Sequence, residues 1–168
     1  YHITPDEVAK RALMPYRIVE TEEKMYEEMG RIMADCIEKN HGDQTVIILP
    51  VGPIGQYKYL AREINERRLS LKNCYFINMD EYLDENDRPI AKDDPLSFHG
   101  IMERVLYSQI DSELIMPENQ RLFPEPGHES EIDSLIDSFG KFDCCLTGVG
   151  INGHIAFNEP GTPFGSVT

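Results

Sequence analysis

Apolar residues recur along the chain in two patterns, one typical of amphipathic helices and one typical of buried strands. Helical spacing predicts helices over 21–39, from 56 to about 64, over 98–106 and over 132–139. Short continuous apolar runs predict strands over 45–49, 74–79 and 142–146, and we expect these strands to be buried. Strands that alternate with helices predict an α/β fold, with a mostly parallel sheet covered by helices on both faces.

The two ends of the chain differ in character from this alternating centre. Thr4-Pro5-Asp6-Glu7 has the form of a capping box with proline at the first helical position, which predicts a helix to about Ala12. We therefore expect residues 1–13 to form a helical extension. The 168 residues suit one α/β domain over 1–168, which we expect to be incomplete at its carboxyl end.

Composition narrows the classes of partner. Thirty acidic residues against 16 basic ones give a net charge of −14, which disfavours nucleic acids and anionic membranes but leaves a small anionic substrate possible. No apolar stretch is long enough to span a bilayer and no signal-peptide pattern opens the chain, so we expect a cytoplasmic protein. The four cysteines form no C-x-x-C pair and are expected to be buried free thiols.

Polar or glycine-rich loops follow all three predicted strands. They cover 50–55, 78–82 and 148–161. Because the carboxyl ends of parallel strands lie at one edge of the sheet, these loops can line one pocket. The second loop supplies Asp80 and Glu81, and the third supplies His154 and Glu159. A histidine beside carboxylates is suited to moving protons, so the pattern indicates an enzyme active site.

Each of these residues also has a structural alternative. Asp80 could cap its loop, His154 could be a satisfied turn residue, and Glu159 could be an exposed acid. Glu81 is more often structural than catalytic. The five histidines are scattered without paired-ligand spacing, so we expect no metal.

Gly148, Gly150 and Gly153 also match the G-x-G-x-x-G spacing of dinucleotide-binding loops. That motif requires a helix to begin at the third glycine, whereas Pro160 and Gly161 interrupt any helix within two turns. We therefore expect these glycines to serve close backbone approach to another ligand, and we expect no nucleotide cofactor.

Two motifs together resemble the glucosamine-6-phosphate deaminase (isomerase) family. They are Asn78-Met79-Asp80-Glu81-Tyr82 and the segment from Gly148 to Pro160, which includes Gly153-His154-Ile155-Ala156-Phe157-Asn158-Glu159. The resemblance runs from about Met14 to the end and implies a Rossmann-like sheet of the sugar-phosphate isomerase and deaminase type. It also implies conversion of a hexosamine 6-phosphate to a ketohexose 6-phosphate with release of ammonia, without a cofactor, in a homo-oligomer.

The resemblance also implies roles for individual residues. Asp80 would remove the C2 proton and return it at C1, and His154, supported by Glu159, would assist ring opening. Asn152 stands in this catalytic group where the family usually has aspartate. Further contacts to the substrate would come from Gly52, Ile54, Glu81, Gly150 and Gly153.

The first loop departs from the family pattern. Val51-Gly52-Pro53-Ile54 stands where a Thr-Gly-Gly-Thr pattern is expected to cradle the phosphate, so two hydroxyl donors and one backbone N–H are lost. Two alternatives therefore remain. One is a non-catalytic sugar-phosphate sensor. The other is a phosphogluconolactonase-like hydrolase, although Tyr82 and the Asn158-Glu159-Pro160 ending disfavour it.

Overall fold

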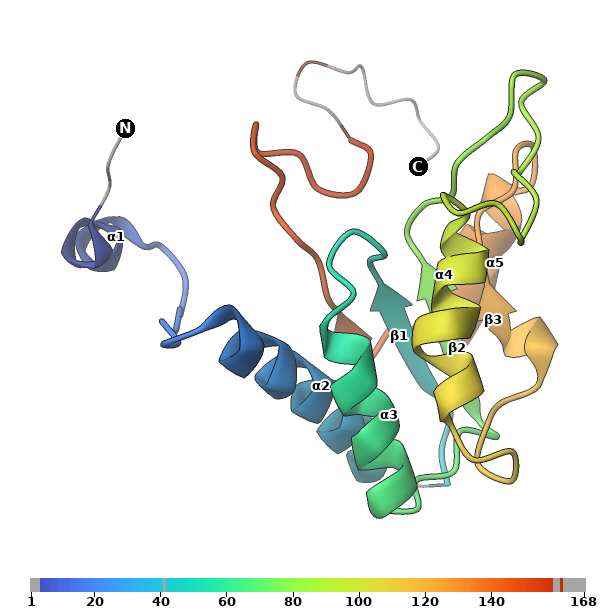
Figure 1. The fold of residues 1–168 in the computed structure, drawn as a ribbon, viewed down its shortest axis with the longest axis horizontal. Helices are drawn as coiled ribbons and strands as arrows, with labels where there is room; N and C mark the ends of the chain where they lie inside the picture. The colour runs from blue at the N-terminus through green and yellow to red at the C-terminus, as the bar shows by residue number, and fades with distance from the viewer. Residues whose placement is uncertain (1–3, 41, 159–160, 162–168) are drawn as a thin grey trace.

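A computed structural model describes residues 4–40, 42–158 and 161 of the chain. The four strands of its sheet are all parallel and lie in the order β3-β2-β1-β4. They are β1 (Thr45–Leu49), β2 (Cys74–Asn78), β3 (Arg121–Leu122) and β4 (Cys144–Cys145). Residue Ile47 of β1 pairs with Phe76 of β2 and with Cys144 of β4, so β1 lies at the centre of the sheet. The predicted parallel α/β fold is confirmed (Figure 1).

Helices connect the strands as the apolar spacing predicted. They are α1 (Pro5–Arg11), α2 (Glu22–Lys39), α3 (Gln56–Glu66), α4 (Phe98–Val105) and α5 (Glu129–Phe139), with short 3₁₀ helices η1 (Tyr107–Gln109) and η2 (Glu118–Gln120). The predicted capping box forms, since Thr4 N and Glu7 N each donate to the other residue's side chain. Gly140 ends α5 with a φ of 69°, the left-handed conformation that glycine adopts without strain. Figure 1 shows α1 standing clear of the sheet.

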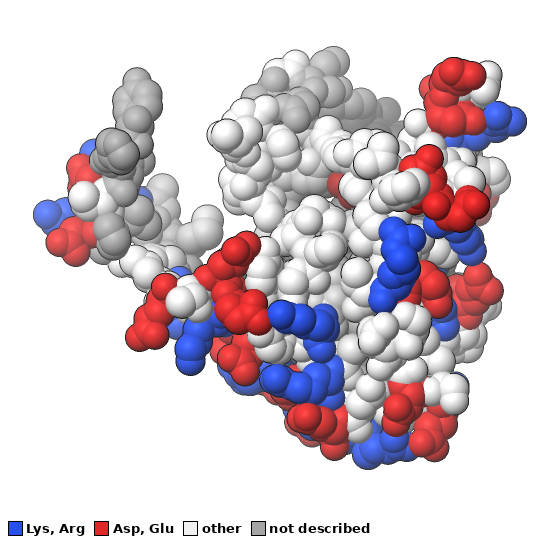
Figure 2. Space-filling model, viewed as in Figure 1, with Lys and Arg blue, Asp and Glu red and all other residues white. Residues whose placement is uncertain are grey.

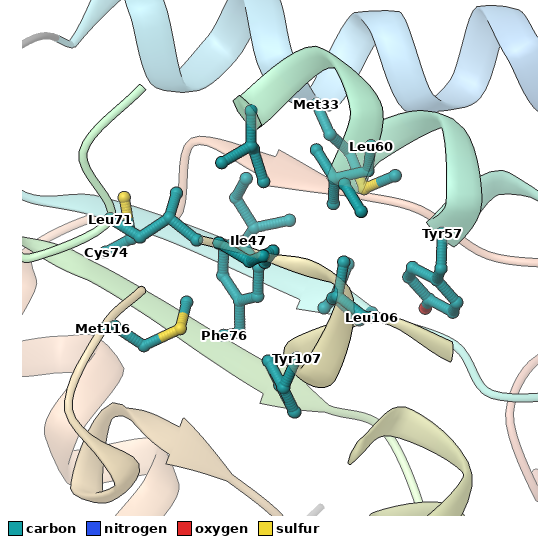
Figure 3. Close-up of a cluster of buried hydrophobic side chains, with 14 of the residues drawn as sticks. Met33, Ile47, Tyr57, Leu60, Leu71, Cys74, Phe76, Leu106, Tyr107 and Met116 are labelled. Atoms are coloured by element: carbon teal, nitrogen blue, oxygen red, sulfur yellow. The ribbon is translucent and has the colours of Figure 1, made fainter. Parts of the chain in front are cut away.

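Alternate residues of the central strands face opposite layers of helix. Ile47, Leu49 and Phe76 are buried in one core with residues of α2, α3 and α4 (Figure 3). Tyr75 points the other way, where its ring lies 4.8 Å from that of Phe139 in α5. Helices therefore cover both faces of the sheet.

Strand β4 differs from its sequence prediction. The apolar run at 142–146 predicts a five-residue buried strand, whereas only Cys144 and Cys145 pair with β1 and Phe142 is 51% exposed. The physical reason is position, because β4 lies at the edge of the described sheet. All four cysteines are free as predicted, but only Cys74 is buried as expected, whereas Cys36 and Cys144 are half-buried and Cys145 is exposed.

Charges on the helical side of the molecule are mixed in sign. Figure 2 shows acidic and basic side chains interleaved over α2 and α3. Arg67 of the α3 C-terminus pairs there with Asp35 and Glu38 of α2. The net charge therefore does not make this face uniformly acidic. Among the described residues, no helix is both long enough and apolar enough to cross a membrane.

Candidate active site

The loops that follow β1, β2 and β4 enclose a cavity of about 220 Å³ at the carboxyl edge of the sheet. This is the convergence of strand ends that the sequence predicted. The first loop contributes Pro50, Gly52 and Pro53, the second contributes Met79 and Asp80, and the third contributes Thr147, Gly148, Val149, Gly150, His154, Ala156 and Phe157. Both proposed acid–base groups, Asp80 and His154, therefore line one space.

Asp80 offers a free carboxylate to the cavity. The side chain is half-buried and accepts no hydrogen bond from any residue that the structure describes. Burial, and secondarily the negative charge of Glu81, raises the pKa of Asp80 above its ordinary value. A desolvated carboxylate that has no hydrogen-bond donor is a stronger base than an exposed one, so the geometry suits proton abstraction.

His154 is held by the shape of its own loop. Gly150 N donates to His154 O at 2.9 Å, and His154 N donates to Asn152 Oδ1 at 3.3 Å. A Cβ added at Gly150 would lie 2.1 Å from His154 Nε2, so the imidazole packs directly over the Gly150 backbone. Gly153 has a φ of 88°, which allows the turn between them. Gly150 lines the cavity, whereas Asn152 and Gly153 shape the loop from outside the lining.

Glu81 lies outside the cavity lining and faces α4. Its carboxylate accepts hydrogen bonds from the backbone N–H groups of Phe98 and His99, each at 2.9 Å, and from Ser97 Oγ at 3.2 Å. Backbone N–H groups in the first turn of a helix lack intrahelical partners, so a carboxylate there satisfies them and complements the helix dipole. These hydrogen bonds give Glu81 a structural role at the N-terminus of α4, which is the alternative that the sequence left open for this residue.

The loop after β1 presents backbone donors in place of hydroxyls. The N–H groups of Gly52, Ile54, Gly55 and Gln56 donate to no residue that the structure describes. Gly52 lines the cavity with open space at its Cα, whereas Ile54 is 41% exposed and lies outside the lining. These donors precede the first turn of α3, where a helix favours anions.

Two buried side chains of α3 fix the carbonyls of this loop. Gln56 Nε2 donates to Pro53 O at 2.6 Å, and the Tyr57 hydroxyl donates to Pro50 O. Both side chains are fully buried, and burial raises the pKa of the Tyr57 hydroxyl. The sequence did not indicate either role. The position of Gln56 directly after a glycine-rich loop is a signal for the first of these roles. The apolar spacing places Tyr57 only among the predicted core residues.

An aromatic cluster joins the second and third loops to α4. The Tyr82 ring lies 4.9 Å from that of Phe98 and 5.3 Å from that of Phe157, centroid to centroid. Phe157 also lines the cavity, next to Ala156, whose φ of 54° is a conformation rarely adopted by residues other than glycine. Sequence reasoning gave Phe157 no role, because an isolated loop aromatic has no periodic pattern to place it.

Glu159 lies outside the described residues. Within the described part of the chain, no group of three or more His, Cys, Asp or Glu side chains is arranged to hold a metal ion. No helix begins at Gly153 over 153–158, so this loop lacks the geometry of a dinucleotide site. The ionisable side chains of the described cavity lining are one carboxylate, Asp80, and one imidazole, His154.

Comparisons with known proteins agree with the motifs. The chain is 35% identical over 158 residues to glucosamine-6-phosphate deaminase 1 of Bacillus subtilis. The aligned region covers 89% of this chain and 60% of that protein. It is 36% identical over 130 residues to a glucosamine-6-phosphate deaminase of Porphyromonas gingivalis, covering 73% of this chain and 46% of that protein. No family model matches the chain.

Solved structures show the same relationship. A monomeric glucosamine-6-phosphate deaminase, described as a missing link of the NagB superfamily, superposes with a TM-score of 0.72 at 32% identity, over 86% of this chain and 59% of that one. A 6-phosphogluconolactonase from Plasmodium vivax shares the fold at a TM-score of 0.62 and 20% identity, over 83% of this chain and 50% of that one.

The parallel sheet and its helices form an α/β fold of the sugar-phosphate isomerase type. In sequence and in fold the chain is similar to glucosamine-6-phosphate deaminases, the family that its two motifs resemble. It spans about 60% of the length of two of the curated relatives that it matches.

Proposed function

We propose that this protein is an amino-sugar phosphate deaminase, which converts a hexosamine 6-phosphate to a ketohexose 6-phosphate and ammonia. The observation that carries the proposal is the placement of Asp80 and His154 on one cavity at the sheet edge. The names of the relatives, which are glucosamine-6-phosphate deaminases, support this substrate class. A cytoplasmic location and a homo-oligomer remain predictions, and the solved relative is described as monomeric.

In this proposal the imidazole of His154 moves the proton that opens the pyranose ring, from the anomeric hydroxyl to the ring oxygen. Asp80 then takes the C2 proton while O1 takes a proton from water, which produces an enolamine across C1 and C2, and Asp80 returns its proton to C1. The resulting C2 imine is hydrolysed by water to the ketone and ammonia. One base on one face of the substrate is sufficient for both proton transfers, because C1 and C2 are adjacent.

The substrate phosphate is assigned to the loop after β1. The backbone N–H groups of Gly52, Ile54 and Gly55 have no acceptor among the described residues and lie at the N-terminus of α3. Backbone amides at a helix N-terminus bind phosphate without side-chain hydroxyls. Gly150, which lines the cavity, is assigned a backbone contact to the sugar and leaves room for the His154 imidazole, while Gly153 and Asn152 maintain the turn that carries His154. Glu159 is assigned the support of His154 from the motif alone.

The decisive experiment is ammonia release by the full-length protein from glucosamine 6-phosphate and galactosamine 6-phosphate. Release that Asp80→Asn abolishes, but that Asp93→Asn leaves intact, is the expected result. Asp93 is a matched control because it is an exposed acid outside the cavity. Binding of either sugar without ammonia release would instead establish the sensor, which the missing hydroxyls of the first loop favour. Hydrolysis of 6-phosphogluconolactone would establish the hydrolase.

A further inference from the structure

Glu81 joins two segments that are distant in sequence. Its Oε1 accepts hydrogen bonds from Tyr82 N at 2.8 Å and from Phe98 N, and its Oε2 accepts from His99 N and Ser97 Oγ. Three of these four donors belong to the start of α4, sixteen to eighteen residues further along the chain. The carboxylate therefore fixes the loop after β2 to the N-terminus of that helix.

Asp80 and Glu81 are adjacent in the chain but have different surroundings. Glu81 is drawn toward α4, and Asp80, one residue earlier, lines the cavity. The charge of Glu81 also contributes to the raised pKa of Asp80.

The same helix end contacts the loop that carries His154. Phe98, whose N–H donates to Glu81, has its ring 5.8 Å from that of Phe157. Phe157 follows His154 by three residues and lines the same cavity as Asp80. The backbone hydrogen bonds of 150–158 in the described structure all stay within this loop. The Phe157 ring is therefore one contact between this loop and the start of α4.

We propose that Glu81 is a positioning residue, which sets the placement of Asp80 relative to His154 through the N-terminus of α4. This inference depends on the proposed function only where it is tested by measuring ammonia release. Among the described residues, the charge of Glu81 acts on Asp80, His154 lines the same cavity, and the Tyr57 hydroxyl of α3 interacts electrostatically with Asp80. Of these, Glu81 alone can be neutralised without removing a group from the cavity or the core.

The test compares Glu81→Gln with Glu85→Gln, which removes the same charge from an exposed position four residues further on. The first readout is the titration of the Asp80 carboxyl carbon by ¹³C NMR. Glu81→Gln is expected to move its midpoint to lower pH, because a negative neighbour has been removed. The second readout is turnover, where kcat should fall roughly tenfold to a hundredfold with little change in KM, as expected for a displaced base. Glu85→Gln should change neither.

Two further variants keep the outcome decisive. Ser97→Ala removes a single hydrogen bond from Glu81 and should reproduce a smaller loss of kcat in a folded protein. Glu81→Asp retains the charge and should keep the Asp80 midpoint closer to that of the wild type. An unchanged midpoint and unchanged kcat in folded Glu81→Gln would overturn the proposal. If the wild type released no ammonia, the proposed function would fail, and the NMR titration would still decide the role of Glu81.

Discussion

The imidazole of His154 occupies the space that a side chain on Gly150 would need. The distance from an added Cβ to Nε2 is 2.1 Å, far below any contact that folded proteins tolerate. The obstructing atoms belong to the end of a side chain and not to the backbone. A substitution at Gly150 would therefore move the imidazole and leave the fold in place.

This relationship predicts the effect of Gly150→Ala. We expect kcat for ammonia release to fall by roughly tenfold to a hundredfold, because a base or acid displaced by about 1 Å loses that much. The matched control is Gly148→Ala, since a Cβ there would meet only Pro53, at an ordinary 3.7 Å. Steady-state kinetics and thermal melts of both variants provide the check. Equal losses in the two variants would contradict the predicted role of the Gly150 contact.

The raised pKa of Asp80 predicts the low-pH limit of activity. The base works only when ionised, so kcat/KM should fall as pH drops through a pKa above the ordinary aspartate value. The same raised pKa makes the free energy of unfolding change with pH in the opposite direction to activity. The folded state holds this proton to higher pH than the unfolded state does, so the carboxylate lowers the free energy of unfolding once pH exceeds the unfolded pKa. Asp80→Asn should therefore abolish turnover and raise the melting temperature at neutral pH. A variant that melts at a lower temperature would contradict the second part.

Pro53 lines the cavity and lacks a backbone N–H. Pro53→Ala restores that donor next to the N–H groups of Gly52 and Ile54. A charged hydrogen bond contributes about 1.5–3 kcal/mol, so KM for the sugar phosphate should fall by about tenfold or more if the donor reaches the phosphate. The measurement is KM alongside the Kd of inorganic phosphate, which must fall in parallel. A lower KM without tighter phosphate binding would place the phosphate elsewhere.

The burial of two leucines predicts that they contribute differently to the free energy of unfolding. Leu60 of α3 is fully buried between α2 and the sheet (Figure 3), whereas Leu96 is 62% exposed. Leu60→Ala should lower the free energy of unfolding by about 2–5 kcal/mol, through lost burial and the cavity that remains. Leu96→Ala should change it by no more than about 0.5 kcal/mol. Urea denaturation of both variants measures the difference.

Periodicity in the sequence was sufficient to predict most of the fold. Strand β1 has the predicted bounds, and α2 begins one residue after Thr21, its N-cap. Both elements are specified by local apolar patterns that tertiary contacts reinforce. Burial at β4 was predicted wrongly, because an apolar run identifies a strand but not the position of that strand in the sheet. The two-residue β3 has too few residues to show any period.

The sequence was sufficient to predict that the loops carrying Asp80 and His154 meet, because strand order alone brings them together. Asp80 and His154 follow strands on either side of β1, and parallel strands necessarily place their loops at the same edge. Sequence could not indicate that Glu81 faces α4, because that direction depends on contacts sixteen residues away. The roles of Gln56 and Phe157 likewise depend on which backbone groups and rings meet in three dimensions.

The loop that carries His154 contains several hydrogen bonds between its own backbone groups. Gly153 N donates to Gly150 O, Gly150 N donates to His154 O, and Asn158 N donates to Ile155 O, so local hydrogen bonds restrain its backbone. Ordering a residue costs about 1–2 kcal/mol of conformational entropy. A loop that is already ordered before substrate arrives does not incur that cost on binding. More of the intrinsic affinity for the sugar is then retained for orienting it against Asp80.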